Sequence, residues 1–192
     1  MIDLNDIEQA RVRIQAVVKN TPCLKSRTFS GELRTNAYFK YETLQLTGSF
    51  KVRGAYNKIG SLSSEELSRG VITASAGNHA QGVAFSASQA GAPSTIVMPK
   101  TTPLIKIENT RRLGGRVVLA GEVFDEAYEE ALSIASREGL VFVHPFNDPL
   151  VIAGQGTIGL EILEQVPNVD AVVVPIGGGG LFSGIAKALL ER

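Results

Sequence analysis

Cysteine is almost missing from this chain of 192 residues, because Cys23 stands alone. A disulfide framework and a zinc site built on cysteines are therefore excluded. Histidine is scarce as well: only His79 and His144 occur, so we expect no metal site. No run of apolar residues approaches the roughly 18 residues that a membrane-spanning helix needs. These absences exclude small disulfide-stabilised proteins and membrane proteins.

Neither sign of charge is in excess. Lys and Arg together number 19, and so do Asp and Glu. Without a polybasic or acidic block, we expect no nucleic-acid partner and no membrane partner. Residues 1–15 mix acids with bases where a signal peptide needs an apolar stretch. The sequence therefore predicts a soluble, cytoplasmic protein.

Short β-branched runs alternate with longer amphipathic runs, which predicts an α/β fold with a mostly parallel sheet. The expected strands are 37–41, 70–73, 94–98, 116–119, 140–143 and 169–176. The expected helices are about 80–90, 104–113, 123–137, one that begins after Pro149 and ends near 166, and 181–192. Ligands of such sheets bind in the loops that follow the carboxyl ends of strands. Three such loops stand out here: 47–51, 75–81 and 177–181.

Four consecutive glycines, Gly177–Gly180, lie between an apolar run and an expected helix. Backbone N–H groups that carry no side chains can surround an oxyanion, and the start of a helix adds partial positive charge. A nucleotide-hydrolysing P-loop is disfavoured, because Leu181 and Phe182 stand where Lys and Ser or Thr are needed. A dinucleotide-dependent oxidoreductase stays open through the looser spacing of Gly178, Gly180 and Gly184.

Lys51 follows Ser49, a residue that can cap a helix beginning near Phe50. Lys51 would then lie in the first turn, where the helix dipole and partial burial lower its pKa. A lysine with a lowered pKa is a nucleophilic amine suited to Schiff-base chemistry, although a single lysine is more often a solvated surface cation. A phosphate cradle together with such a lysine is what pyridoxal phosphate requires.

The third loop, 75–81, places a hydroxyl, an amide and an imidazole at the start of a helix. Such a set suits a carboxylate, and Asn78 is also able to donate to a phenolate oxygen. The alternative is an N-cap turn in which Ser75 and Asn78 only bond the backbone.

In this order, Ser49–Ala55, Ser75–Gly82 and Gly177–Leu181 resemble the fold-type II pyridoxal-phosphate enzymes, in particular the threonine/serine dehydratase (threonine ammonia-lyase) family. His144–Phe146 and Val151–Thr157 are similar to that family too. The resemblance implies two open parallel-sheet α/β domains with the cofactor, pyridoxal 5'-phosphate, between them. Residues 1–63 and 148–192 would form part of the large domain, and residues 64–147 an inserted small domain.

The resemblance also implies a role for each site residue. Lys51 would join the cofactor as a Schiff base and take the α-proton of the substrate, and Phe50 would pack beside the pyridine ring. Asn78 would bond the 3' oxygen of the cofactor. The cofactor phosphate would be bound by Gly177, Gly178, Gly179, Gly180 and Leu181. The substrate carboxylate would be received by Ser75, Ala76, Gly77, Asn78 and His79.

The implied reaction converts L-threonine or L-serine to a 2-oxo acid and ammonia. Serine racemases of the family carry a second serine where this chain has Ala76, so Ala76 and also Phe146 favour the dehydratase over a racemase. A non-catalytic sensor that binds an amino acid or the cofactor is a further alternative.

The chain departs from the family by stopping at Arg192, one helix after the glycine loop. We therefore expect an incomplete large domain and weak or absent ammonia release by this chain alone. The expected partners are a small amino-acid substrate and either further copies of the chain or a complementing C-terminal chain. The open strand edge at 169–176 favours self-association.

Overall fold

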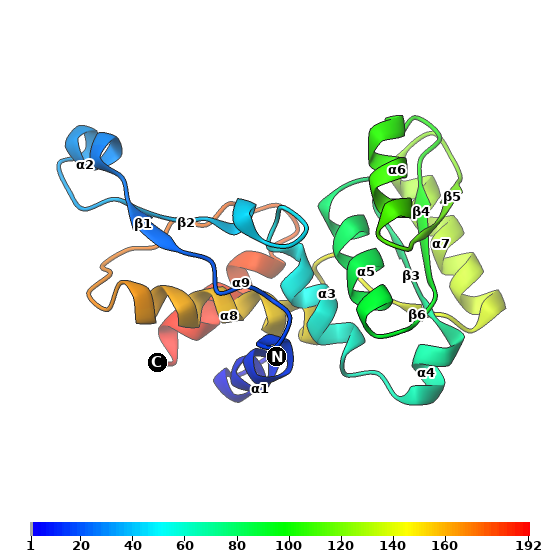
Figure 1. The fold of residues 1–192 in the computed structure, drawn as a ribbon, viewed down its shortest axis with the longest axis horizontal. Helices are drawn as coiled ribbons and strands as arrows, with labels where there is room; N and C mark the ends of the chain where they lie inside the picture. Colours follow the sequence, from blue (N-terminus) through cyan, green and yellow to red (C-terminus); the bar gives the residue numbers. More distant parts are fainter. Residues whose placement is uncertain (1) are drawn as a thin grey trace.

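A parallel sheet of four strands forms the centre of one half of the molecule (Figure 1). The computed structural model describes residues 2–192. The strands of the sheet, in the spatial order β5-β4-β3-β6, are β3 (Val71–Ala74), β4 (Ser94–Met98), β5 (Arg116–Leu119) and β6 (Val141–Phe142). Every neighbouring pair is parallel, which confirms the predicted α/β class.

The remaining elements are mostly helices. In chain order they are α1 (Leu4–Ile14), α2 (Arg27–Leu33), η1 (Glu42–Leu44), α3 (Lys51–Ile59), α4 (Ser64–Arg69), α5 (Asn78–Gln89), α6 (Leu104–Arg112), α7 (Phe124–Glu138), α8 (Pro149–Gln165) and α9 (Gly180–Leu190). A separate antiparallel pair joins β1 (Cys23–Lys25) to β2 (Tyr38–Lys40). Residues 2–63 and 148–192 thus contain helices and this pair, and no second parallel sheet.

Helices cover both faces of the parallel sheet, as Figure 1 shows for α5 and α7. Side chains alternate between the two faces along a strand, so Val71 of β3 packs with α5 while Ile72 packs with α7. The central strands β3 and β4 are buried along their whole length. Continuous apolar strands are typical of a parallel sheet covered on both faces, which is how these segments were predicted.

The direction of the strand order reverses next to β3. The chain runs outward from β3 to β4 and β5, and then returns to place β6 on the other side of β3. At such a reversal, the loops after the two neighbouring strands separate and leave a crevice at their carboxyl ends. Here these loops are 75–77 and 143–148, so the topology points to this edge as the ligand-binding edge.

Helix α8 is the centre of the other half and contacts α1, α3 and α9. Three of its glycines allow the close approaches. A Cβ on Gly154 would lie 2.6 Å from the Arg53 carbonyl oxygen of α3, and one on Gly156 would lie 2.9 Å from the Gly184 carbonyl oxygen of α9. Gly159 faces Ala188 of α9 in the same way. Packing of α8 on α9 therefore explains Gly184, the last glycine of the dinucleotide-like spacing.

The predicted strand 169–176 is wrong, because this segment forms neither strand nor helix. Val172 and Val174 pack against a cluster on α8 and α9, while Val173 between them is 97% exposed. The alternation is that of a strand with one buried face. A strand also needs a neighbour to accept its backbone hydrogen bonds, and no strand lies beside this segment within residues 2–192.

Replacing Val173 with lysine is expected to reduce self-association of the chain without loss of stability. The segment exposes unpaired backbone and an apolar side chain, which favour edge-to-edge pairing, and a lysine opposes such pairing. The free energy of unfolding should change by no more than about 0.5 kcal/mol. Light scattering over a range of protein concentrations measures the effect.

Val12→Lys is the matched control, because Val12 is 67% exposed on α1 and has no open backbone. If both variants reduced association equally, the proposal that segment 169–176 mediates self-association would be contradicted.

Within residues 2–192, no helix has the combination of length and apolar character that crossing a membrane requires.

Candidate active site

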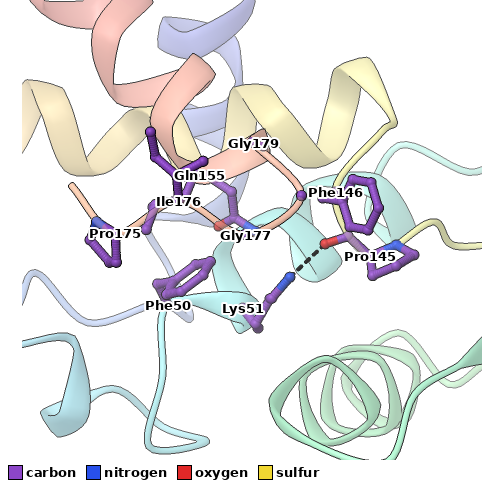
Figure 2. A pocket seen from close by; sticks show the side chains of 12 residues that line it. Phe50, Lys51, Pro145, Phe146, Gln155, Pro175, Ile176, Gly177 and Gly179 are labelled. Atoms are coloured by element: carbon purple, nitrogen blue, oxygen red, sulfur yellow. Dashed lines mark hydrogen bonds between the residues drawn. The ribbon is translucent and has the colours of Figure 1, made fainter. Parts of the chain in front are cut away.

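Lys51 and the four glycines line one cavity of about 290 Å³ (Figure 2). The cavity is lined by Phe50, Lys51, Pro145, Phe146, Gln155, Pro175, Ile176, Gly177, Gly178, Gly179, Gly180 and Leu181. Lys51 contributes the cavity's cationic side chain, and no acidic residue of the described chain lines it. The cavity therefore suits an anion placed next to an amine.

Lys51 is the first residue of α3, and its side chain points into the cavity. Its Nζ donates a hydrogen bond to the Pro145 carbonyl oxygen at 2.6 Å and lies 5.4 Å from the centre of the Phe50 ring. Burial lowers the pKa of Lys51 below its ordinary value, because the charged amine is poorly solvated there. Lys51 is thus in the first turn, as expected, but the residue before the helix is Phe50 and Ser49 makes no capping bond.

The four glycines of the loop have different structural reasons for lacking a side chain. A Cβ on Gly178 would lie 2.3 Å from the Phe146 ring, and one on Gly180 would lie 2.5 Å from the Phe146 carbonyl oxygen. Gly179 has φ +84°, which L side chains rarely adopt. A Cβ on Gly177 or Gly179 would meet nothing within 4 Å, so these two positions border open space. That space is available to a ligand.

Backbone N–H groups face this space at the start of α9. The helix begins at Gly180, and its N-cap residue Gly179 has no side chain to bond them. The first four N–H groups of a helix lack partners within it, and the helix dipole adds about half a positive charge there. The loop therefore has the donors and the charge that a phosphate group needs.

Pro145 and Phe146 reach the cavity because their loop is held by His144. Its Nδ1 accepts hydrogen bonds from the backbone N–H groups of Phe146 at 3.2 Å and Asn147 at 2.8 Å. Burial lowers the pKa of His144, in agreement with a neutral ring that accepts. No site role was predicted for Pro145 from the sequence. Its position in the loop after β6 could have indicated one, because ligands bind at the carboxyl ends of parallel strands.

The loop 75–79 does not line the cavity but lies beside Lys51. A Cβ on Gly82, one turn further along α5, would lie 3.2 Å from the Lys51 carbonyl oxygen. Asn78 is exposed at the start of α5, and Ser75 Oγ accepts a hydrogen bond from the Gly77 N–H at 3.2 Å. Helix α5 is therefore packed directly on the first turn of α3, with its N-terminus at the reversal of the strand order.

The side chain of His79 is buried inside the protein. Its Nε2 lies 3.0 Å from the Val143 carbonyl oxygen, and since a carbonyl only accepts, Nε2 carries the proton. Burial is the largest cause that lowers the pKa of His79 to about 3, and the nearby charge of Lys51 adds to it. The ring of His79 therefore ties α5 to the loop after β6 as a neutral group.

Replacing His79 with glutamine is expected to make the stability of the protein less dependent on pH in acid. Below pH 6.5 the unfolded chain binds a proton on His79, whereas the folded chain does not until about pH 3. Stability from the neutral ring is thus complete above pH 6.5 and lost as the pH falls, by at most about 1.4 kcal/mol per pH unit. Urea unfolding at several pH values measures the slope. A glutamine amide can still donate to Val143, so equal slopes in both proteins would refute the assignment.

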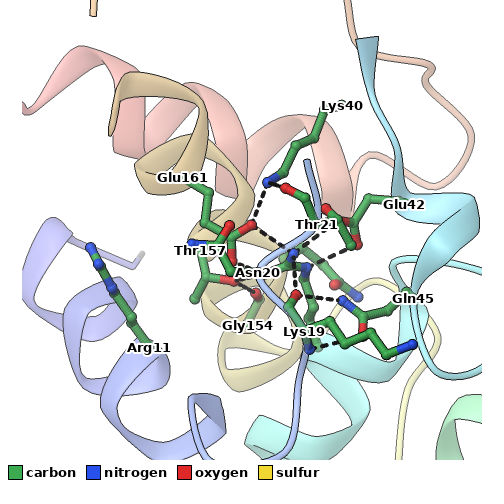
Figure 3. A network of polar contacts seen from close by, with 12 residues as sticks. Arg11, Lys19, Asn20, Thr21, Lys40, Glu42, Gln45, Gly154, Thr157 and Glu161 are labelled. Atoms are coloured by element: carbon green, nitrogen blue, oxygen red, sulfur yellow. Dashed lines mark hydrogen bonds and ion pairs between the residues drawn. The ribbon is translucent and has the colours of Figure 1, made fainter. Parts of the chain in front are cut away.

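A buried ionic network anchors α3 behind the cavity (Figure 3). Arg53 of α3 is fully buried; its Nη1 donates to Glu161 of α8 at 2.6 Å and its Nε to Glu42 at 2.9 Å. Lys40 of β2 also donates to Glu161, at 2.5 Å. Burial alone would lower the pKa of Arg53, but the hydrogen bonds and charges of Glu42 and Glu161 raise it. The network fixes the helix whose first residue is Lys51.

A parallel α/β sheet together with a partly buried lysine that shares a cavity with a glycine-rich helix start is typical of proteins that bind a phosphorylated ligand next to an amine. The chain belongs to the family of pyridoxal-phosphate dependent enzymes, whose family model matches residues 14–192. This confirms the resemblance read from the motifs, and pyridoxal phosphate is the cofactor of this family.

The known proteins that this chain resembles include enzymes of threonine and serine chemistry. An L-threonine ammonia-lyase of Thermotoga maritima is 59% identical over 98% of this chain and 47% of its own length. A solved maize serine racemase matches with a TM-score of 0.95 and 40% identity over 97% of this chain and 57% of that one. Threonine deaminase isoform 2 of Solanum lycopersicum matches with a TM-score of 0.90 and 48% identity, over 97% and 53%. The chain thus spans about half the length of the proteins it matches.

The residues of the cavity fit pyridoxal phosphate. Lys51 supplies an amine with a lowered pKa, and the open space at Gly177 and Gly179 lies against unbonded N–H groups. Lys51 would hold the aldehyde end of the cofactor and the glycine loop its phosphate. Within residues 2–192, no group of three or more His, Cys, Asp or Glu side chains is placed to hold a metal ion.

Proposed function

We propose that the protein, with pyridoxal phosphate, converts L-threonine or L-serine to a 2-oxo acid and ammonia. The observation that carries the proposal is that the amine of Lys51 and the glycine loop line one cavity. The identity to L-threonine ammonia-lyases supports the reaction type.

Lys51 is proposed to take the proton from Cα of the amino acid. A base must be neutral to accept a proton, and burial of Lys51 lowers its pKa in that direction. Bound pyridoxal phosphate supplies a ring that accepts the electron pair left on Cα. When Lys51 is a free amine, the Pro145 carbonyl oxygen accepts a hydrogen bond from its Nζ and keeps it at the cavity.

The loop Ser75, Ala76, Gly77, Asn78 and His79 is proposed to receive the substrate carboxylate. It stands at the N-terminus of α5, where N–H groups and the helix dipole favour an anion. Since the ring of His79 is bonded to Val143, this residue would contribute its backbone only. Phe50 is proposed to pack beside the cofactor ring, because it lines the cavity next to Lys51. Asn78 is proposed to bond the 3' oxygen of the cofactor, because it begins α5, the helix whose Gly82 packs on Lys51.

A serine racemase is the second candidate, and the maize serine racemase structure favours it. Its opposite-face proton transfer would need a hydroxyl that Ala76 does not offer. A sensor without turnover is the third.

The test is to incubate the chain and pyridoxal phosphate with L-serine and, separately, with L-threonine. Ammonia and the matching 2-oxo acid are the expected products. D-serine without ammonia would establish a racemase, and binding without any product would establish a sensor. Addition of the C-terminal half of a relative, expressed separately, should raise the rate if this chain forms only part of the cofactor pocket.

We also propose a cytoplasmic location. We further propose that residues 1–63 and 148–192 form part of a large domain and that residues 64–147 form an inserted small domain. The proposal also includes association, either with further copies of the chain or with a complementing C-terminal chain.

A further inference from the structure

The side-chain amide of Gln155 in α8 is buried, and its oxygen has a hydrogen-bond partner while its NH₂ group has none among the described residues. The residue is 1% exposed. Its Oε1 accepts a hydrogen bond from the Gly54 N–H in the first turns of α3 at 3.2 Å, while its Nε2 has no partner among the described residues. Buried amide donors almost always have partners, so a free one beside a ligand cavity needs an explanation.

The orientation of this amide is determined by its neighbour. If the amide were turned over, two donors would face each other, because the group opposite Oε1 is the Gly54 N–H. Glycine at position 54 also leaves room for Nε2, because a Cβ on Gly54 would lie only 2.5 Å from it. The Nε2 donor is therefore fixed in position against α3.

Gln155 belongs to the wall of the cavity that contains both Lys51 and the glycine loop. Figure 2 shows its side chain close to Gly177. The next residue, Gly156, packs on Gly184 of α9, since a Cβ on Gly184 would lie 2.7 Å from the Gly156 nitrogen. Gln155 also lines the same cavity as Gly180 and Leu181, the first residues of α9, where the N–H groups lack partners within the helix.

We propose that Nε2 of Gln155 donates a hydrogen bond to an oxygen of the phosphate monoester held by Gly177–Gly180. The inference rests on the proposed function for the identity of the ligand. The phosphate cradle is then not formed by main chain alone: one side-chain donor from α8 completes it. Because the same amide bonds Gly54, Gln155 also links the phosphate to the helix that begins with Lys51.

The first experiment observes the unmodified chain with inorganic phosphate as the probe. In ¹⁵N-labelled protein, the side-chain NH₂ signal of Gln155 and the backbone signals of Gly177–Gly180 are expected to shift with one common dissociation constant. Shifts of the glycines without Gln155 would overturn the proposal. So would the absence of any shift at Gln155 when pyridoxal 5'-phosphate is bound.

The second experiment uses Gln155→Glu, which keeps Oε1 for Gly54 but replaces the donor with a negatively charged oxygen. The dissociation constant for pyridoxal 5'-phosphate is expected to rise about tenfold or more. The constant for pyridoxal, which has no phosphate, should change less than about threefold. Gln9→Glu on α1 is the control, because Gln9 is exposed and far along the chain from the cavity. Equal weakening of both ligands, or none, would overturn the proposal.

The two proposals fail separately. If pyridoxal 5'-phosphate attaches to Lys51 but Gln155→Glu changes nothing, the function stands and the role of Gln155 falls. If inorganic phosphate shifts Gln155 and the glycines but nothing attaches to Lys51, the anion site stands and the function falls. If Gln155→Glu fails to fold, the NMR signals of Gln155 and Gly177–Gly180 in the unmodified chain still test the proposal.

Discussion

Replacing Lys51 with alanine is expected to abolish covalent capture of pyridoxal 5'-phosphate by this chain. Lys51 is the one lysine that lines the described cavity, and burial lowers its pKa, so its neutral amine is the one in position to attack an aldehyde. After reduction with borohydride, peptide mass analysis should place the added cofactor on the Lys51 peptide of the unmodified chain and on no peptide of the variant. Where ammonia release is measurable, it should fall by about 10²–10⁴-fold.

Two controls separate the amine from its charge and from lysines in general. Lys51→Arg keeps a cation in the cavity but has no amine that condenses with an aldehyde, so it should behave like Lys51→Ala. Lys100→Ala removes an exposed lysine and should capture the cofactor as the unmodified chain does. Labelling of Lys51→Ala at another residue with the same efficiency would contradict the assignment.

Replacing Arg53 with methionine is expected to lower the free energy of unfolding by about 3–5 kcal/mol. The substitution leaves the carboxylates of Glu42 and Glu161 buried without the guanidinium that bonds both of them. In a chain of this size, such a loss lowers the melting temperature by about 6–20 °C. Urea unfolding and calorimetry measure the change. Because α3 carries Lys51, capture of the cofactor by the folded variant should weaken as well.

The control is Arg11→Met, which breaks an exposed ion pair with Glu164 and should cost no more than about 1 kcal/mol. Adding Glu42→Gln to Arg53→Met should recover part of the stability, since Arg53 is the cation that pairs with Glu42, whereas Glu161 keeps Lys40 as a partner. Equal effects of Arg53→Met and Arg11→Met would show that burial of the network contributes nothing.

The sequence predicted the strands of the parallel sheet and singled out Lys51 and the glycine loop, because each of these features leaves a local signal in the chain. The strands β3 and β4 were readable as continuous apolar runs, and the helices by their spacing. Lys51 and Gly177–Gly180 were readable from the residue types that their chemistry requires. The strand at 169–176 was predicted from the same local signal and failed, since pairing depends on a neighbour that the pattern does not contain.

Residues that reach the cavity through long-range contacts carry little signal in their own residue type. Gln155 and Pro145 reach the cavity because α8 and the loop after β6 are folded against α3, about 100 positions away along the chain. Likewise, the sequence places His79 in the loop expected to receive a carboxylate, and only the fold shows that its ring bonds the Val143 carbonyl oxygen.

By itself, the sequence determined the fold class and singled out Lys51 and the side-chain-free loop as candidates, because apolar periodicity, glycine runs and residue types are local properties of the chain. The tertiary structure decided that Lys51 and this loop share one cavity, that the ring of His79 bonds the Val143 carbonyl oxygen, and that Arg53 is buried between two glutamates. These depend on which surfaces pack together, and packing joins residues that no local pattern relates.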